Sequence, residues 1–223
     1  FLKFPKSTKG MRRIDTSYTT APLSEYIGSH IYAILGYEVH QTLLGIKDNK
    51  LVVACKDFTD SNRRLQEYRE LKNVYNKDLE EKLDQTITES EDSVHGTNLS
   101  ALLIHLEHNP VLSKLPEIKE RFWDCVLIDG FINNNDRNSG NWGVLIDRDE
   151  TLKLAPVYDN GAAFSNKLSD QQIQAILNDP VRLKQSAIMN ISSGYLDNGK
   201  SIYFEKLIKQ DYPDLKASII RVV

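Results

Sequence analysis

The sequence lacks several features that would assign the chain to a familiar class. It holds only two cysteines, Cys55 and Cys125, which lie 70 positions apart. So sparse a pair forms neither a disulfide framework nor a set of zinc ligands, and it fits a reducing cytosol. No apolar run reaches the roughly 18 residues that a membrane-spanning helix needs, and the start of the chain has no signal-peptide pattern. We therefore expect a cytoplasmic protein without membrane contact.

The chain also lacks an excess of charge of either sign. Its 28 basic and 31 acidic residues give a formal net charge of −3, which argues against a general nucleic-acid binder. The sequence also lacks an initiator methionine. It opens in an apolar run and ends within a helical pattern. We expect the chain to be a fragment of a longer protein.

The start of the chain predicts a strand followed by a helix. Residues Phe1–Phe4 are typical of the end of a strand, which Pro5 would stop because proline has no N–H to donate. A helix is expected over residues 22–35, with Pro22 suited to its first turn and Gly36 to its end. Its apolar residues form one stripe at helical spacing: Leu23, Ile27, Ile31, Ile34 and Leu35.

Two strand-forming runs come next, over residues 39–46 and 50–55. The dipeptide Asp48-Asn49 between them is a good hairpin signal. The second run is apolar throughout, so we expect a buried strand. It leads into residues 56–58, which resemble a hinge between two lobes. We place the first lobe at residues 1–58 and the second at residues 59–223.

The second lobe is predicted to be mostly helical around one short hairpin. Helical patterns cover three segments: residues 64–75, 99–107 and 118–131. The acidic segment 85–98 is expected to be a loop, and two short strands are expected at 142–146 and 152–155. The order predicts an α+β fold in the two-lobed layout of protein kinases, with a small β-rich lobe, truncated at its start, before a larger helical lobe.

Three oxygen-bearing side chains mark the turn-rich part of the second lobe. Asp136 follows the helix of 118–131, Asn141 comes five positions later, and Asp159 follows the short hairpin. Phosphoryl transfer needs an oriented nucleophile, magnesium on the phosphates and positive charge against their oxygens. The spacing suits Asp136 as catalytic base and Asn141 and Asp159 as ligands of Mg²⁺, which prefers oxygen donors. Each residue alone would be ordinary turn chemistry, but the set predicts a kinase site.

Residues of the first lobe supply candidates for ATP binding. Lys3 on the opening strand is either a solvent-facing lysine or a cleft lysine that binds ATP phosphates and pairs with Glu25 of the following helix. Glu25 alone could simply complement the helix dipole. The pair gains weight because the three oxygen-bearing residues follow in the order that kinases use. At the hinge we expect main-chain groups of Cys55, Lys56 and Asp57 to hold the adenine.

The motif of residues 135–143, followed by Ala155-Pro156-Val157-Tyr158-Asp159, resembles HipA-like serine/threonine kinases. Together with residues 1–5, 24–26 and 52–58 it is most similar to their CtkA-type branch (cell-translocating kinase A). The resemblance spans roughly residues 1–165. It implies a protein-kinase-like fold, transfer of the ATP γ-phosphate to a protein serine or threonine, and frequent autophosphorylation, with ATP and Mg²⁺ as cofactors.

The same resemblance implies further roles and partners. It gives Asp136, Asn141, Asp159 and Lys3 the roles described above. It also implies that Tyr158 lies beside the nucleotide. Asn138 stands where the family usually has histidine; asparagine can still hydrogen-bond to the nucleotide but carries no charge. HipA-like kinases commonly pair with an antitoxin protein, whereas the CtkA type resembles a secreted effector. The phosphate-covering loop expected before Lys3 is not in this sequence.

Two alternatives stay open at this point. The pattern Asp136-Arg137-x-x-x-Asn141 also resembles the catalytic loop of phosphoinositide kinases. A lipid kinase should carry a basic, membrane-facing segment after its metal-binding Asp, yet only Lys167 follows Asp159 before Asp170. The second alternative is a nucleotide-binding pseudokinase or a toxin module that acts through an antitoxin. It predicts a missing metal ligand, whereas all three positions are filled. No DNA-reading motif is present, so no direct nucleic-acid binding is expected.

Overall fold

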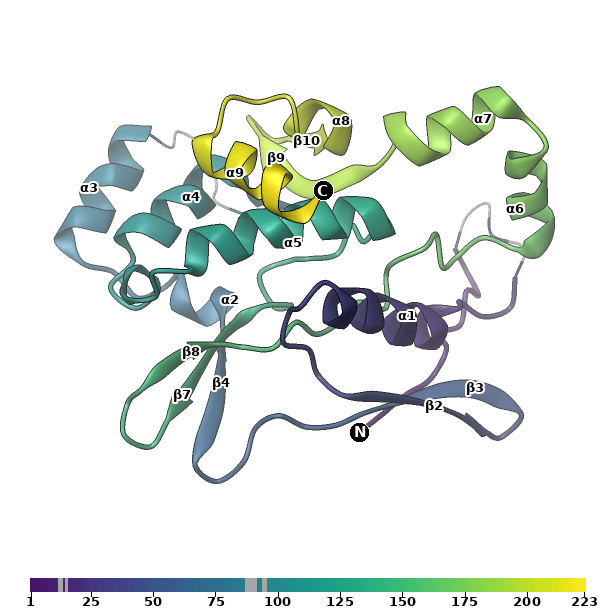
Figure 1. The fold of residues 1–223 in the computed structure, drawn as a ribbon, viewed down its shortest axis with the longest axis horizontal. Coiled ribbons are helices and arrows are strands. Elements are labelled where there is room, and N and C mark those ends of the chain that lie inside the picture. Colours follow the sequence, from purple (N-terminus) through teal and green to yellow (C-terminus); the bar gives the residue numbers. More distant parts are fainter. Residues whose placement is uncertain (12–13, 15, 87–91, 94–95) are drawn as a thin grey trace.

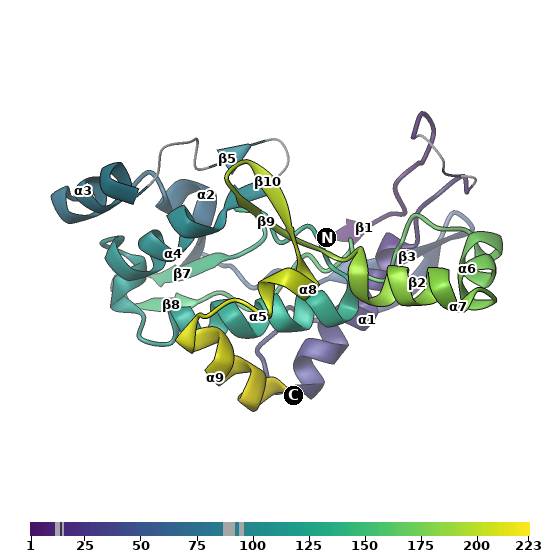
Figure 2. The same ribbon diagram turned by 90° about the horizontal axis from the view of Figure 1, so that it is seen from above.

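Three small sheets and a group of helices make up the computed structural model, which describes residues 1–11, 14, 16–86, 92–93 and 96–223. Figure 1 shows helix α1 (Ala21–Ile34) close to strands β2 (Thr42–Lys47) and β3 (Lys50–Cys55). The longer helices α4 (Leu99–His108) and α5 (Ile118–Ile132) lie above strand β7 (Gly143–Asp147) in the same view. In the view from above, α3 (Lys77–Thr86) and the pair α6 (Asp170–Leu177) and α7 (Pro180–Lys184) lie at opposite ends (Figure 2). Among the described residues, no helix is both long and apolar enough to cross a membrane.

The first sheet is antiparallel and confirms the predicted strands. In pairing order its strands are β1 (Leu2–Lys3), β3 (Lys50–Cys55) and β2 (Thr42–Lys47). Asp48 and Asn49 have φ angles of 51° and 55°, the left-handed backbone that a two-residue hairpin turn needs. Lys3 lies opposite Val53 of the buried central strand, so the sheet fixes where the lysine backbone lies.

Helix α1 (Ala21–Ile34) is present as predicted, but its apolar stripe is not its buried face. Ile34 is 82% exposed, and the other stripe residues except Ile31 are also exposed. The buried face instead carries the polar residues Ser24, Glu25 and Ser29 together with Tyr32. The stripe gave the wrong orientation because the helix packs against a polar cluster.

The helix predicted over 64–75 is wrong, since most of that segment forms β4 (Arg63–Glu67) and the one-turn helix α2 (Tyr68–Leu71). The second sheet has the order β4, β7 (Gly143–Asp147) and β8 (Leu152–Leu154), all antiparallel. At Gly143 a Cβ would collide with the backbone oxygen of Gln66, so glycine permits the close approach of the two strands. Pairing with a distant strand overrides the local helical pattern.

The larger, helical part is built around α5 (Ile118–Ile132), which the sequence predicts within one residue. This helix sends Phe122, Trp123 and Val126 into the main core, where α4 (Leu99–His108) also packs. Its later turns contribute Ile128 and Ile132 to a second core with Tyr32 of α1. The helix therefore links the main core to α1 and ends directly before the loop that holds Asp136.

The C-terminal region contains strands as well as the predicted helices. The hairpin of β9 (Ser192–Asp197) and β10 (Lys200–Tyr203) joins β6 (Gly96–Asn98) and β5 (Asp92–Ser93) in a third sheet. The loop predicted over 85–98 is only partly described: residues 85–86 belong to α3 (Lys77–Thr86), and residues 92–93 and 96–98 form the strands β5 and β6. Residues 87–91 and 94–95 lie outside the described residues. The other elements are short: η1 (Leu112–Lys114), α6 (Asp170–Leu177), α7 (Pro180–Lys184), η2 (Gln185–Met189), α8 (Phe204–Leu207) and α9 (Pro213–Val222). A small sheet-rich part and a larger helical part confirm the α+β prediction, while the boundary at residue 58 stays a prediction.

Candidate active site

Lys3 bridges two carboxylates that come from distant parts of the sequence. Its Nζ donates to Glu25 Oε2 at 2.8 Å and to Asp159 Oδ1 at 2.6 Å. Burial alone would lower the pKa of the lysine, but the charges of the two carboxylates outweigh it and raise the pKa. The Lys3 and Asp159 side chains are 28% and 42% exposed, whereas Glu25 is fully buried. The predicted pair is therefore present, with Asp159 as its third member on the open side.

The Glu25 carboxylate is held from several directions. Besides Lys3, it accepts from His40, whose Nε2 lies 2.8 Å from Oε1, and from the backbone N–H of Asn160 at 3.1 Å. Burial would raise the pKa of this carboxyl, yet the hydrogen bond from His40 and the charge of Lys3 lower the pKa to about 2. The group is thus ionised at neutral pH. Sequence reasoning missed His40, because a single histidine ahead of a strand gives no local signal.

A buried chain of hydrogen bonds continues from α1 to α5. Asn160 Nδ2 donates to Ser29 Oγ at 3.0 Å, and Arg137 Nη2 donates to Asn160 Oδ1 at 2.6 Å. Arg137 also donates twice to Asp129 of α5, at 2.8 and 2.9 Å. At Gly28 of α1 a Cβ would come within 2.8 Å of the Asn160 Cβ, so the close approach needs glycine. The chain ties the loop after α5 to the helix that carries Glu25.

The loop after α5 brings Asp136 and Asn141 together. Asn141 Nδ2 donates to the backbone oxygen of Asp136 at 2.6 Å. Asn138 Nδ2 donates to Asp136 Oδ1 at 2.9 Å, and its own Oδ1 accepts from the N–H of Gly140 at 2.8 Å. The Asp136 side chain is exposed. Asn138 thus orients the carboxylate of Asp136 in this structure, and its predicted contact with the nucleotide stays a prediction.

A cavity of about 600 Å³ lies between the first sheet, β4 and this loop. Five of the predicted site residues line it: Lys3, Asp57, Asn141, Tyr158 and Asp159. The other predicted residues lie outside its lining, with Glu25 and Cys55 buried behind Lys3 and with Lys56, Asp136 and Asn138 exposed. Tyr158 contacts Phe58, with ring centroids 5.5 Å apart, so one wall of the cavity is aromatic. Such a wall suits a planar base.

The hinge prediction meets main-chain groups that already have partners. The N–H of Cys55 donates to Phe1 O and its carbonyl accepts from the Phe1 nitrogen, both at 2.9 Å. The N–H of Lys56 donates to Gln41 O at 2.9 Å. Of the three residues, Asp57 is the one that lines the cavity. The adenine contact of this segment stays a prediction.

Three arginines in the cavity wall were missed by sequence reasoning. Arg63 and Arg64 come from β4, and Arg69 comes from α2. Arg63 pairs with Asp147 at 2.7 Å, and Arg69 pairs with Glu67. The helix predicted over residues 64–75 hid this grouping, because it forms only when β4 and the short helix α2 follow one another along the cavity wall. Arg64 adds positive charge to that of Lys3 on the cavity wall, whereas Arg63 and Arg69 are paired with carboxylates.

The donor set of the predicted metal site fits a hard cation. Asn141 and Asp159 both face the cavity, and both offer oxygen atoms. The amide nitrogen of Asn141 is held by Asp136, which leaves its side-chain oxygen as the donor. Asp159 has a φ of 59°, a left-handed conformation that costs energy for a residue other than glycine and that is common at functional sites.

Comparison with known proteins decides the family. The chain is 33% identical over 226 residues to serine/threonine-protein kinase CtkA of Helicobacter pylori, covering 99% of this chain and 64% of that protein. The crystal structure of the H. pylori proinflammatory kinase CtkA matches with a TM-score of 0.80 and 31% identity, over 99% of this chain and 71% of that one. This chain belongs to the family of the CtkA kinase. The resemblance inferred from the sequence motifs is confirmed, as is the kinase-like fold.

The chain spans less than two thirds of the length of the curated CtkA protein, at 64%. Two further comparisons add little to the CtkA match. A structure of HipA from Shewanella oneidensis, in complex with HipB and operator DNA, matches with 13% identity and a TM-score of 0.45, over 100% of this chain and 52% of that one. A likeness this low is too weak to describe the fold or the partners of this chain. No protein-family model matches the chain.

Proposed function

We propose that this CtkA-type chain carries the catalytic part of an ATP-dependent serine/threonine protein kinase. The observation that carries the proposal is the meeting of Lys3, Asn141 and Asp159 at one cavity, with Asp136 on the adjoining loop. These are the parts that phosphoryl transfer needs: a cation for the phosphates, oxygen ligands for magnesium and a carboxylate for the attacking hydroxyl. The match to CtkA supports the same reaction class.

Each residue has a defined task in the proposed reaction. Lys3 binds the phosphates from its position beside Asp159, and Glu25 keeps the lysine in place. Asn141 and Asp159 would hold magnesium, which would supply positive charge against the phosphate oxygens. Asp136 accepts the proton of the serine or threonine hydroxyl. The hydroxyl oxygen bonds to the γ-phosphorus, and the bond between that phosphorus and ADP breaks. Asn138 keeps the Asp136 carboxylate oriented through their hydrogen bond at 2.9 Å.

The proposal also covers how the nucleotide is held and which partners the chain has. The wall of Tyr158 and Phe58 holds the adenine ring, and Arg64 of β4 adds positive charge near the phosphates. A protein substrate follows from the reaction, and autophosphorylation can be read in the same assay. An antitoxin partner, and the choice between a cytoplasmic toxin and a secreted effector, stay predictions from the family resemblance.

Phosphoryl transfer by Asp136→Ala tests the proposal. With labelled ATP and a protein substrate, the rate should fall by about 10²–10⁴-fold, the usual contribution of a general base. The matched control is Asp149→Ala, because Asp149 is exposed in the turn between β7 and β8, and its rate should equal that of the wild type. Full activity of Asp136→Ala would refute the assignment. Labelling of phosphoinositide vesicles but not of protein would favour the lipid-kinase alternative.

A further inference from the structure

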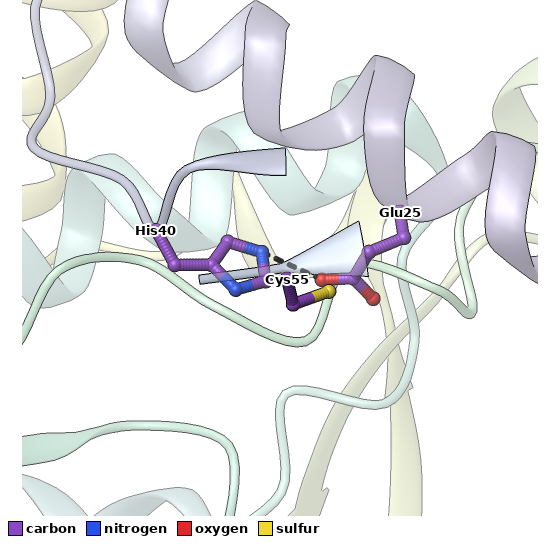
Figure 3. A group of neighbouring side chains, drawn as sticks. All are labelled: Glu25, His40 and Cys55. Carbon is purple, nitrogen blue, oxygen red and sulfur yellow. Dashed lines mark ion pairs between the residues drawn. The ribbon is translucent and has the colours of Figure 1, made fainter. Parts of the chain in front are cut away.

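A second cluster of ligand-type side chains lies behind Lys3. Figure 3 shows the carboxylate of Glu25 on α1, the imidazole of His40 before β2 and the thiol of Cys55 at the end of β3 pointing toward one another. One potential ligand atom from each lies within 4.8 Å of the other two, and all three residues are buried. The spacing of the two cysteines excluded a cysteine-based zinc site, but the fold joins one of them to a histidine and a glutamate.

The donor types in this cluster differ from those of the predicted magnesium site. Imidazole nitrogen, thiolate sulfur and carboxylate oxygen are the ligands of zinc and similar borderline cations, whereas Mg²⁺ selects oxygen alone. Three protein ligands leave a fourth, open position for water, which is common in zinc sites that are not purely structural. The chain therefore holds two sets of donors with different metal preferences.

The ligand atoms are already held in place by their neighbours. His40 Nε2 lies 2.8 Å from Glu25 Oε1 and 3.1 Å from Ser29 Oγ, and the Asn160 N–H supports the same carboxylate oxygen. A cation would replace the proton shared between His40 and Glu25. It would also displace the thiol proton, because burial raises the pKa of Cys55 to about 11. Binding would therefore release protons, as is usual for such ligands.

An entry path is present at His40. This residue lines the cavity that contains Lys3 and also a second cavity of about 370 Å³, which is lined by Ser29, Gln41 and Thr42 among others. A small ion can therefore approach the nearly buried imidazole from two cavities. Glu25 and Cys55 lie beside that imidazole (Figure 3).

We propose that Glu25, His40 and Cys55 bind a zinc-class divalent cation that inhibits the kinase by drawing Glu25 away from Lys3. A doubly charged ion beside Glu25 competes with the lysine for the carboxylate and repels its ammonium group. Lys3 is partly exposed and can move toward the cavity. The inhibitory half of this proposal rests on the proposed kinase function, whereas the binding half does not.

Cobalt binding tests the site without any need for activity. Co²⁺ is titrated into the metal-free chain with a non-chelating phosphine present to keep the thiols reduced. The wild type should give a sulfur-to-cobalt charge-transfer band, Cys55→Ser should lose it, and His40→Gln should bind at least about tenfold more weakly, by analogy with zinc sites. The matched control is Cys125→Ser, which removes the chain's other thiol and should keep the band. Circular dichroism checks that each variant is folded.

The results separate the two halves of the proposal. Absence of the band in the wild type, or its persistence in Cys55→Ser, overturns the metal site. For the inhibitory half, each variant is compared with its own zinc-free rate at saturating Mg²⁺, and the zinc concentration for half inhibition should rise at least about tenfold in Cys55→Ser but not in Cys125→Ser. Equal inhibition of the two variants overturns it. A chain that shows the cobalt band but no phosphoryl transfer contradicts the proposed function alone.

Discussion

The two helices that meet at the site, α1 and α5, are buried by opposite means. Helix α5 buries large apolar side chains such as Trp123 and Ile128 in two cores. Helix α1 exposes most of its apolar residues and buries Glu25 and Ser29 against His40 and Asn160. The main contribution of α5 is therefore packing, whereas α1 is held largely by hydrogen bonds and charge.

The difference teaches how stability and function are divided in this chain. Apolar packing is non-directional and gives α5 a fixed place from which the loop of Asp136 begins. Hydrogen bonds are directional, so the polar face of α1 sets the orientation of Glu25 and, through it, of Lys3. Changes in α5 should act mainly on stability, whereas changes in the polar face of α1 should act on phosphoryl transfer as well as on stability.

The largest expected effect comes from the ion pair that joins the two helices through the loop. Arg137→Met leaves the carboxylate of Asp129 buried without its cation, which should cost about 3–5 kcal/mol of unfolding free energy. Urea unfolding measures this loss. The matched control, Arg182→Met, breaks the exposed pair with Asp179 and should cost at most about 1 kcal/mol. Equal losses in the two variants would contradict a buried link between α1 and α5.

One pair of identical substitutions compares the helices directly. Ile128→Ala on α5 removes a side chain that is 1% exposed and should destabilise the protein by about 2–5 kcal/mol. Ile34→Ala on α1 removes one that is 82% exposed, so its effect should stay within about 0.5 kcal/mol. Thermal and urea unfolding give both values. A large loss from Ile34→Ala would show that the apolar stripe of α1 is buried after all.

Removal of the Lys3 ammonium tests the functional role of the polar face. Lys3→Met should lower phosphoryl transfer by about 10²-fold or more, the usual cost of losing one charge-stabilising group, with a smaller effect on stability. Lys6→Met is the matched control because Lys6 is exposed on the same segment. A rate for Lys3→Met equal to that of Lys6→Met would remove the lysine from the site.

The most gradual effect is a pH dependence of stability that comes from Glu25. Its folded-state pKa of about 2 lies below its ordinary value of 4.5, so its contribution is complete above pH 4.5 and is lost as the pH falls toward 2. The contribution amounts to about 3 kcal/mol at neutral pH. The wild type should therefore exceed Glu25→Gln in unfolding free energy by an amount that shrinks over this pH range. A constant difference would contradict the depressed pKa, and exposed Glu80→Gln serves as control.

Local signals predicted much of this fold, and non-local ones account for what was missed. The Asp48-Asn49 turn, the helix of 118–132 and the order of Asp136, Asn141 and Asp159 can be recognised because each depends on nearby residues. The strand β4 could not, because its partner β7 lies some 80 positions away. His40, Ser29 and Asn160 give no signal either, since their hydrogen bonds form only after the chain has folded. The orientation of α1 was missed for the same reason.

The central claim is that Asp159 and its neighbours form one site for magnesium and ATP. Calorimetry of ATP binding with and without Mg²⁺ tests it most directly, on the wild type, Asp159→Ala and the exposed control Asp149→Ala. The account predicts that Mg²⁺ tightens ATP binding by the wild type and the control, and that Asp159→Ala loses this gain. An equal gain from Mg²⁺ in Asp159→Ala would contradict it.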